Sequence, residues 1–408
     1  MKQTEIGLIP DDWEVKEFNQ VATLINGRAY SQSELLKQGK YKVLRVGNFG
    51  TNDTWYYSNL ELPEKQYCNK GDLLYCWSCT YGAYIWNEDD TIYHYHIWKI
   101  QTNNADKYYL KYILNNDIAS QMSNSNGSTM AHITKGFLEK RRFVYPPFEE
   151  QQRIAKALSD VDALISTTGK LLQKKKNIKQ GTMQELLTGK KRLPDFAPVV
   201  VEPVETSGYK QTELGLIPED WEVKNFDVLF DICTETVPLA DINQKYYVGT
   251  ENMMQDKKGV VENSIELKYQ SVREYLKEDI LISNIRPYLK KVWFADKNGG
   301  CSTDVLVFRN KRMQNDSLFL FMLVSADRFF QIVNDNAVGT KMPRGDKNII
   351  KQILFALPSS KEEQTAIANV LSSMDKEIET LNTKLEKYRN LKTAMMQQLL
   401  TGKIRLVN

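Results

Sequence analysis

The sequence predicts an α+β protein in which two α/β bodies are separated by two long antiparallel helices that form a coiled coil, with a pseudo-twofold internal repeat. The first observation behind this prediction is that KQTEIGLIPDDWEVKEF at 2–18 returns as KQTELGLIPEDWEVKNF at 210–226, with three differences. The second is that FEEQQRIAKALSDVDALI (148–165) and LLTGK (186–190) return as KEEQTAIANVLSSMDKEI (361–378) and LLTGK (399–403). The intervening segments hardly match. Two copied frames with different contents indicate one task performed on two different targets.

Length, composition and charge bound the class of protein. The 408 residues suffice for two or three domains, and the duplication selects an even number. A net charge of +3 permits a polyanionic partner without requiring one. The sequence has no apolar run of about 18 residues and no signal-peptide pattern, so we expect no membrane association. Five cysteines, an odd number, fit a reducing compartment, and we expect a cytoplasmic protein.

The first body is predicted at 1–148 and the second at 209–360. Each opens with a short polar segment that ends in a Trp-Glu-Val-Lys strand. Runs rich in β-branched and aromatic residues, separated by Gly, Asn and Asp, predict further strands at 42–46, 72–77, 93–100, 279–283, 292–295 and 304–309. Helical stretches are predicted at 107–116 and 317–334. We interpret each body as a mixed α/β domain with a strongly curved sheet.

Two long helices are predicted at 149–190 and 361–403, with an extended linker at 191–208 after the first. Apolar residues recur in both on alternating steps of three and four, which indicates the seam of a coiled coil. The seam residues are Leu158, Val161, Ile165 and Leu172 in the first helix and Leu371, Met374, Ile378, Leu381 and Leu385 in the second. The first helix also places Lys175 and Lys179 on its seam. An ordinary helical bundle is the alternative, but the regular seven-residue step favours a coiled coil.

The sequence shows no catalytic motif. A phosphate-binding loop and a GxGxxG turn are missing. Tyr145-Pro-Pro-Phe148 differs from the signature of base-amino methyltransferases, which places Asp, Asn or Ser first to hold the target amino group. Cys76 and Cys79 form a CxxC pair without the second pair that a zinc site needs. The chain has only three histidines, which offers few candidates for acid–base catalysis. We expect a non-catalytic binding subunit that holds no metal and no cofactor.

Loops in both bodies combine cationic, amide and hydroxyl side chains with aromatic ones. Arg and Lys suit guanine O6 and N7, Asn suits adenine N6 and N7, and Ser and Thr reach phosphates or either base. The predicted DNA-binding residues of the first body are Arg45, Asn48, Ser78, Thr80, Tyr81, Tyr84, Ser128, Thr129 and His132. Those of the second body are Asn252, Asn284, Arg286, Tyr288, Lys290, Lys341 and Arg344. For any single residue a solvated loop is the competing interpretation, whereas the set in two variable bodies favours nucleic acid.

The repeated frame resembles the specificity subunit of type I restriction–modification systems. The resemblance rests on the GLIPxDWEV strand, the Glu-Glu-Gln-xx-Ile-Ala helix start and the LLTGK-x-Arg helix end, all present twice. It also includes Gly71-Asp-Leu-Leu, which matches Glu278-Asp-Ile-Leu, and Gly127-Ser-Thr-Met-Ala-His-Ile-Thr134. The second repeat departs at the last place, where it has Gly339-Thr-Lys-Met-Pro-Arg-Gly-Asp346. The likeness covers essentially the whole chain.

The resemblance implies that each body is a target-recognition domain for one half of a bipartite, asymmetric double-stranded DNA site. It further implies that the long helices set the distance between the half-sites and dock two methyltransferase subunits. Two restriction subunits, which are translocase–nucleases, would join the same core. S-adenosylmethionine, ATP and Mg²⁺ are then expected on the partner subunits rather than on this chain.

Two alternative functions remain at this stage. One is a specificity subunit that serves a methyltransferase-only system, which would use the same chain. The other is a coiled-coil scaffold whose α/β bodies bind proteins rather than DNA. Footprinting on duplex DNA after co-purification with a methyltransferase subunit separates the scaffold from the DNA reader.

Overall fold

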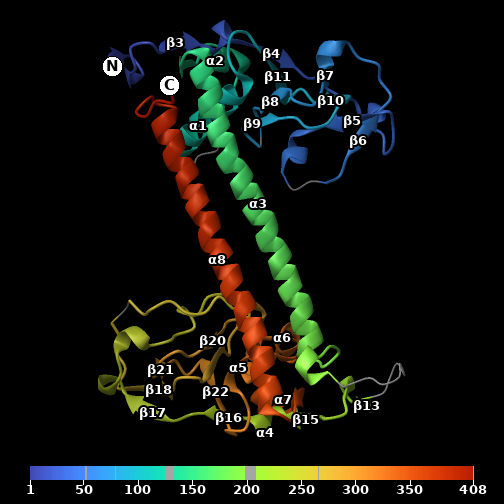
Figure 1. The fold of residues 1–408 in the computed structure, drawn as a ribbon, viewed down its shortest axis with the longest axis vertical. Helices are drawn as coiled ribbons and strands as arrows, with labels where there is room; N and C mark the ends of the chain where they lie inside the picture. Colours follow the sequence, from blue (N-terminus) through green and yellow to red (C-terminus); the bar gives the residue numbers. More distant parts are fainter. Residues whose placement is uncertain (51–52, 79, 125–132, 198–207, 265, 408) are drawn as a thin grey trace. The chain divides into compact units, whose positions relative to one another are not determined.

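The computed structural model describes residues 1–50, 53–78, 80–124, 133–197, 208–264 and 266–407. Contacts divide the chain into two compact units. Unit 1 consists of Met1–Lys170 and Asn382–Asn408, and unit 2 consists of Leu171–Leu381. Two helices of 39 residues each, α3 (Phe148–Leu186) and α8 (Lys361–Leu399), each contribute one part to unit 1 and the other part to unit 2. Both are labelled in Figure 1. At 1.5 Å per residue, each helix is about 58 Å long.

Unit 1 contains a hairpin, a strand pair and two four-stranded sheets. The hairpin joins β1 (Lys2–Thr4) to β2 (Gly7–Ile9), and β3 (Glu14–Glu17) pairs antiparallel with β12 (Arg142–Tyr145). One sheet is antiparallel, in the order β4 (Ala22–Asn26), β11 (Ile97–Thr102), β8 (Leu73–Cys76) and β9 (Gly82–Ile85). The other has the order β6 (Tyr56–Ser58), β5 (Tyr41–Leu44), β10 (Thr91–Tyr93) and β7 (Tyr67–Cys68), with β5 and β10 parallel. The helices of this body are α1 (Lys107–Asn124) and α2 (Lys135–Glu139).

Unit 2 is built from the same kinds of parts. The hairpin joins β13 (Tyr209–Thr212) to β14 (Gly215–Pro218), and β15 (Trp221–Asn225) pairs with β23 (Leu354–Pro358). The antiparallel sheet has the order β16 (Phe230–Cys233), β22 (Val305–Asn310), β19 (Ile280–Ser283) and β20 (Val292–Phe294). A smaller sheet contains β17 (Thr236–Pro238), β18 (Ser271–Tyr275) and β21 (Gly299–Cys301). The helices are α4 (Phe226–Leu229), α5 (Ser317–Ser325), α6 (Asp327–Asp335) and α7 (Lys347–Gln352).

The two bodies share a topology although their sequences hardly match. The four-stranded antiparallel sheets have the same strand order: β4-β11-β8-β9 in unit 1 corresponds strand for strand to β16-β22-β19-β20 in unit 2. Gly71 and Glu278 occupy the same turn before β8 and β19, and both have a positive φ, of 91° and 72°. The variable segments therefore keep one framework and change the side chains that it carries.

Two predicted elements are divided in the structure. The predicted strand 93–100 is interrupted by a turn around Tyr95, so that β10 and β11 belong to different sheets. The predicted helix 317–334 breaks at Ala326 into α5 and α6, which are bent by 54°. The side chain of Asp316 accepts a hydrogen bond from the Phe319 amide at the start of α5.

A buried glutamate explains why the sequence repeats the Glu-Glu-Gln and LLTGK-x-Arg motifs. In unit 1 Glu150, 1% exposed at the start of α3, accepts hydrogen bonds of 2.8 and 2.7 Å from Arg405, which follows α8. Arg405 also donates to Asp12 at 2.9 and 2.7 Å. Burial alone would raise the pKa of Glu150, but hydrogen bonds from Arg405 and Trp13 lower it below its usual value.

Unit 2 repeats this arrangement. Glu363, at the start of α8 and 1% exposed, accepts a hydrogen bond of 2.8 Å from Arg192, which follows α3. Arg192 also donates to Asp220 at 3.0 and 2.9 Å. In each unit, therefore, the start of one long helix is joined to the end of the other and to the Trp-Glu-Val-Lys strand segment. We call these two ion-pair groups the clamps.

Glycine is required where each helix end meets the hairpin. Gly189 and Gly402 both have a φ of 69°. A Cβ at Gly189 would lie 2.4 Å from Cδ of Pro218, and one at Gly402 would lie 2.5 Å from Cδ of Pro10. The repeated LLTGK and GLIP motifs are thus complementary surfaces of one packing contact, made once in each unit.

The glutamine that follows each buried glutamate connects the long helix to its body. Gln151 donates to the carbonyl of Pro146 at 2.9 Å and accepts from the amide of Asp106, the residue before α1. Gln364 donates to Pro358 at 2.9 Å and accepts from the amide of Asp316, the residue before α5. Both side chains are buried and satisfied, which is the condition for placing an amide in a core.

The described helices, taken one by one, fall short of a membrane span. None of them combines the length and apolar character needed to cross a bilayer, although α5 and α6 together pass by length and composition. Most residues of α5 are buried in the core of unit 2.

Replacing Arg405 by Ala should lower the free energy of unfolding by about 3–5 kcal/mol, because it leaves the buried carboxylate of Glu150 without its partner. Chemical denaturation of the full chain measures this loss. Arg389→Ala is the matched control, since Arg389 makes an exposed pair with Glu386 within α8 and its loss should cost about 0–1 kcal/mol. Equal small losses in the two variants would contradict the role of the clamp.

Candidate nucleic-acid interface and helix pair

In unit 2, two of the polar segments singled out from the sequence lie side by side. The connection 284–291 follows β19, and the segment 338–345 lies between α6 and α7. The amide of Gly345 donates to the carbonyl of Asn284 at 3.1 Å, and the amide of Arg286 donates to Pro343 at 2.8 Å. Arg344 is fixed by two reciprocal backbone hydrogen bonds of 2.9 Å with Val338. The structure thus brings Asn284, Arg286 and Arg344 together.

A third segment, which sequence reasoning missed, completes this surface. Residues 302–304 precede β22, and the amide of Asn284 donates to the carbonyl of Asp304 at 2.8 Å. The carboxylate of Asp304 also lies 2.9 Å from the guanidinium of Arg344. The sequence hides this proximity, because Asp304 lies 20 residues after Asn284 and 40 residues before Arg344. It follows only from the pairing of β19 with β22, which sets Ser283 opposite Val305. We call the three segments 284–291, 302–304 and 338–345 the unit 2 loop surface.

The first of these segments carries backbone strain. Arg286 and Lys290 flank a short 3-10 helix, η8 (Pro287–Leu289), and have φ angles of 53° and 48°. Left-handed conformations cost a residue with a Cβ roughly 1–2 kcal/mol. Strain of this kind clusters at functional sites, where the surrounding structure holds it in place.

Other predicted residues of unit 2 have different placements. Asn252 is buried and accepts a hydrogen bond from the amide of Gly249 at 2.9 Å, so its side chain supports a turn. Lys290 donates to Asp327 of α6 at 2.8 Å. Tyr288 is 54% exposed, and Lys341, three residues before Arg344, is also exposed.

Unit 1 places a loop at the equivalent position. Residues 77–81 connect β8 to β9, as 284–291 connect β19 to β20. The amide of Trp77 donates to the carbonyl of His96 at 3.3 Å, which parallels the bond from Asn284 to Asp304. The segment before β11 therefore lies against this loop, and it carries His94, Tyr95 and His96 where unit 2 carries Ser, Thr and Asp.

Aromatic rings dominate this part of unit 1. Trp77 stacks on Trp98 with centroids 5.7 Å apart and meets His96 edge-on at 5.0 Å. Tyr95 is 41% exposed and lies 4.0 Å from His96, centroid to centroid. Burial, with a smaller contribution from His96, lowers the pKa of His94 to about 4, so its imidazole is neutral near pH 7. This part of unit 1 therefore exposes flat aromatic rings rather than charged groups.

The remaining predicted residues of unit 1 are scattered. Asn48 accepts from the amide of Arg45 and donates to the carbonyl of Thr54, so it supports its own turn in the short helix η3 (Val46–Phe49). Tyr84 stacks on Phe49 at 4.4 Å, and Ser78 is buried. Thr80 and Tyr81 are half-buried. Ser128, Thr129 and His132 lie outside the described residues.

Metal binding finds no support in the part of the chain that the structure describes, where no group of three or more His, Cys, Asp or Glu side chains is arranged to hold an ion. Cys68 and Cys76 are buried, and burial raises the pKa of both thiols well above the usual value.

The predicted seam residues are all buried or half-buried. In unit 1, Leu158, Val161 and Leu385 are buried and Ile165 is half-buried. In unit 2, Leu172 and Leu371 are buried, whereas Met374, Ile378 and Leu381 are half-buried.

Cross-helix ion pairs show that the two helices run antiparallel within each unit. In unit 2, Lys175 donates to Glu377 at 2.9 Å and Lys179 pairs with Asp375, so the partner number falls as the lysine number rises. In unit 1, Lys392 of α8 lies 2.6 Å from Asp162 of α3, which also accepts a hydrogen bond from Tyr112 of α1.

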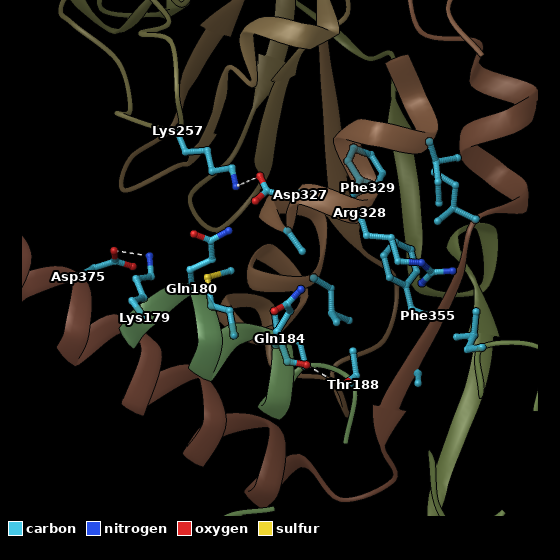
Figure 2. Close-up of a pocket in the computed structure, with 18 of the residues that line it drawn as sticks. Lys179, Gln180, Gln184, Thr188, Lys257, Asp327, Arg328, Phe329, Phe355 and Asp375 are labelled. Atoms are coloured by element: carbon cyan, nitrogen blue, oxygen red, sulfur yellow. Dashed lines mark hydrogen bonds and ion pairs between the residues drawn. The ribbon is translucent and has the colours of Figure 1, made fainter. Parts of the chain in front are cut away.

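Unit 2 has a recess of about 800 Å³ beside the helix pair, lined by α3, α6, α8, β23 and the β13–β14 hairpin. Figure 2 shows Gln180 and Gln184 extending from α3 into it, with Phe329 and Phe355 on the far side. Its rim carries the pairs Lys179–Asp375 and Lys257–Asp327, the latter at 2.9 Å. The acidic and basic groups of the rim are thus matched, and the recess offers apolar and amide surface rather than net charge.

Comparison with known proteins gives one consistent result. The family described as "Type I restriction modification DNA specificity domain" matches residues 10–179 and 218–387. The type I restriction enzyme MjaVIII specificity subunit of Methanocaldococcus jannaschii is 27% identical, over 98% of this chain and 95% of that protein. The EcoDI specificity subunit of Escherichia coli is 23% identical, over 72% of this chain and 70% of that protein.

Solved structures share the fold. The S subunit of a type I restriction–modification system from M. genitalium superposes with a TM-score of 0.59 at 12% identity, covering 98% of both chains. A chain from a study of complex assembly and conformational transition of the type I system has a TM-score of 0.52 at 13% identity, covering 97% of this chain and all of that one.

Proposed function

Because this chain belongs to the type I restriction–modification DNA specificity family, we propose that it is the cytoplasmic subunit that reads a bipartite, asymmetric DNA sequence. Each body reads one half-site. One observation supports this proposal. Each body has an equivalent four-stranded sheet with a loop at the equivalent position, and the two loops carry different side chains. A common framework with unlike loops suits the reading of two unlike half-sites.

The two loop surfaces support different modes of contact. The unit 2 loop surface offers Arg286 and Arg344, whose guanidinium groups can donate two hydrogen bonds to guanine O6 and N7. The surface in unit 1 offers Tyr95 and Trp77, whose rings suit contact with thymine methyl groups, sugars or exposed base faces. Asn48 and Asn252 are excluded from this proposal, since their side chains are used within turns.

We further propose that the long helices dock two methyltransferase subunits and fix the distance between the half-sites. The catalytic steps belong to the partners, which bring S-adenosylmethionine and, in the translocase–nuclease subunits, ATP and Mg²⁺. The recess of unit 2 supports one docking point, since a matched rim around an apolar floor suits a protruding apolar side chain of a protein rather than a phosphate.

Replacing Arg344 by Ala should weaken binding to the cognate duplex by about 1–3 kcal/mol, because one bidentate contact with guanine is lost. Fluorescence anisotropy of the full chain with its methyltransferase subunits, at fixed salt concentration, measures the change. Lys341→Ala is the comparison: a phosphate contact should weaken binding to all duplexes alike. Unchanged affinity of Arg344→Ala for the cognate duplex would remove Arg344 from the reading surface.

Replacing Gln180 by Trp should fill the recess and weaken docking of one methyltransferase subunit. Gln180 is exposed on α3, so the change should leave the thermal stability of the free chain unaltered. Asn177→Trp provides the control, because Asn177 is exposed on the same helix outside the recess. Native mass spectrometry of the complexes reports the number of bound subunits, and full occupancy in both variants would show that the recess is not a docking point.

A further inference from the structure

An ion pair at the centre of the unit 2 loop surface joins two residues of opposite charge. The Arg344 guanidinium lies 2.9 Å from Asp304, with side chains that are 53% and 34% exposed. Their backbones are held independently of the pair. Arg344 bonds twice with Val338, and the carbonyl of Asp304 accepts from Asn284. Both side chains therefore extend from positions that are already set.

The pair adds little to the stability of the chain. Exposed ion pairs typically contribute about 0–1 kcal/mol, because water screens the charges and two side chains lose freedom. Its effect on orientation is larger. An unrestrained arginine samples many rotamers, whereas a carboxylate paired with one terminal nitrogen of a guanidinium restricts where the group lies and leaves its other N–H donors available.

We propose that Asp304 is a positioning residue for DNA reading: it holds the guanidinium of Arg344 and offsets its charge, so that Arg344 discriminates between bases rather than attracting phosphates in general. This inference rests on the proposed function of the second body. Restraint lowers the ordering cost of the contact with guanine. The carboxylate of Asp304 repels phosphate oxygens. Contacts between Arg344 and the phosphates of a duplex without the matching base therefore contribute little to the binding affinity.

The equivalent segment in unit 1 cannot act as Asp304 does, because it has His96 where unit 2 has Asp304. The segment before β22 thus contacts its neighbours through an ion pair in unit 2, and the segment before β11 contacts Trp77 through an edge-on ring contact in unit 1.

The test uses the full chain with its methyltransferase subunits. Binding of Asp304→Asn is measured to the cognate duplex, defined by sequencing of methylated sites, and to duplexes with one base pair changed. We expect the ratio of cognate to changed-site affinity to fall at least about fivefold, the lower range of one bidentate contact. We also expect tighter non-specific binding, with a salt dependence steeper by up to about 0.9 per freed positive charge.

Three further variants distinguish positioning from a structural effect. Asp304→Glu should restore discrimination. Asp304→Asn should have no further effect on discrimination in an Arg344→Ala background, because it acts through that arginine. Asp231→Asn removes the same charge from another surface pair, Asp231–Lys311 on β16 and the end of β22, and should leave discrimination unchanged.

The outcomes separate the inference from the proposed function. If the unaltered complex shows no preference among duplexes, the proposed function is wrong and the inference is lost with it. If the unaltered complex discriminates and Asp304→Asn discriminates equally well, the proposed function stands and the inference is overturned. Equal losses for Asp304→Asn with and without Arg344 would also overturn it.

Discussion

A buried carboxylate facing an arginine is the interaction on which both units depend. Glu150 and Glu363 begin the two long helices, and each is neutralised by an arginine that follows the end of the other helix. A buried charge without its partner is strongly destabilising, so these contacts specify which helix ends belong together. The repeated motifs in the sequence are the parts of this contact: the Trp strand, the Glu-Glu-Gln start, the TGK turn and the arginine. The duplication is thus a consequence of one packing arrangement that is made twice.

The clamps leave the loop surfaces free to vary. The loops lie at the ends of strands β8 and β19, while Gln151 and Gln364 connect each long helix to the start of a body helix. Changes in loop side chains therefore do not disturb the residues that hold the body to the helix pair. The two bodies show this separation directly, because they share a strand order while one surface carries aromatic rings and the other carries paired charges. Under the proposed function, a change of target therefore requires changes in the loop side chains and not in the clamps.

Much of the frame was predictable from the sequence, and the family resemblance is confirmed. The long helices follow from their seven-residue repeat, and several strands follow from local patterns. The break at Ala326 and the turn around Tyr95 were not predictable, because neither carries a glycine or proline. The proximity of Asp304, Arg344 and Asn284 depends on strand register and on backbone bonds between distant segments. The pairing of Glu150 with Arg405, 255 residues apart, is likewise invisible locally although both motifs are evident. Spatial neighbours of this kind require the fold.

The proposed function requires that the two bodies of one chain read two unlike half-sites of one DNA site. Sequencing of methylated DNA from cells that express the chain with its methyltransferase subunits tests it most directly. The account predicts methylation at a single class of site with two unlike half-sites and a spacer of constant length. Exchange of residues 227–360, the part of the second body that does not match the first, for the same part of a relative should then change only one half-site. Methylation at one continuous sequence, or a spacer that varies from site to site, would contradict the account.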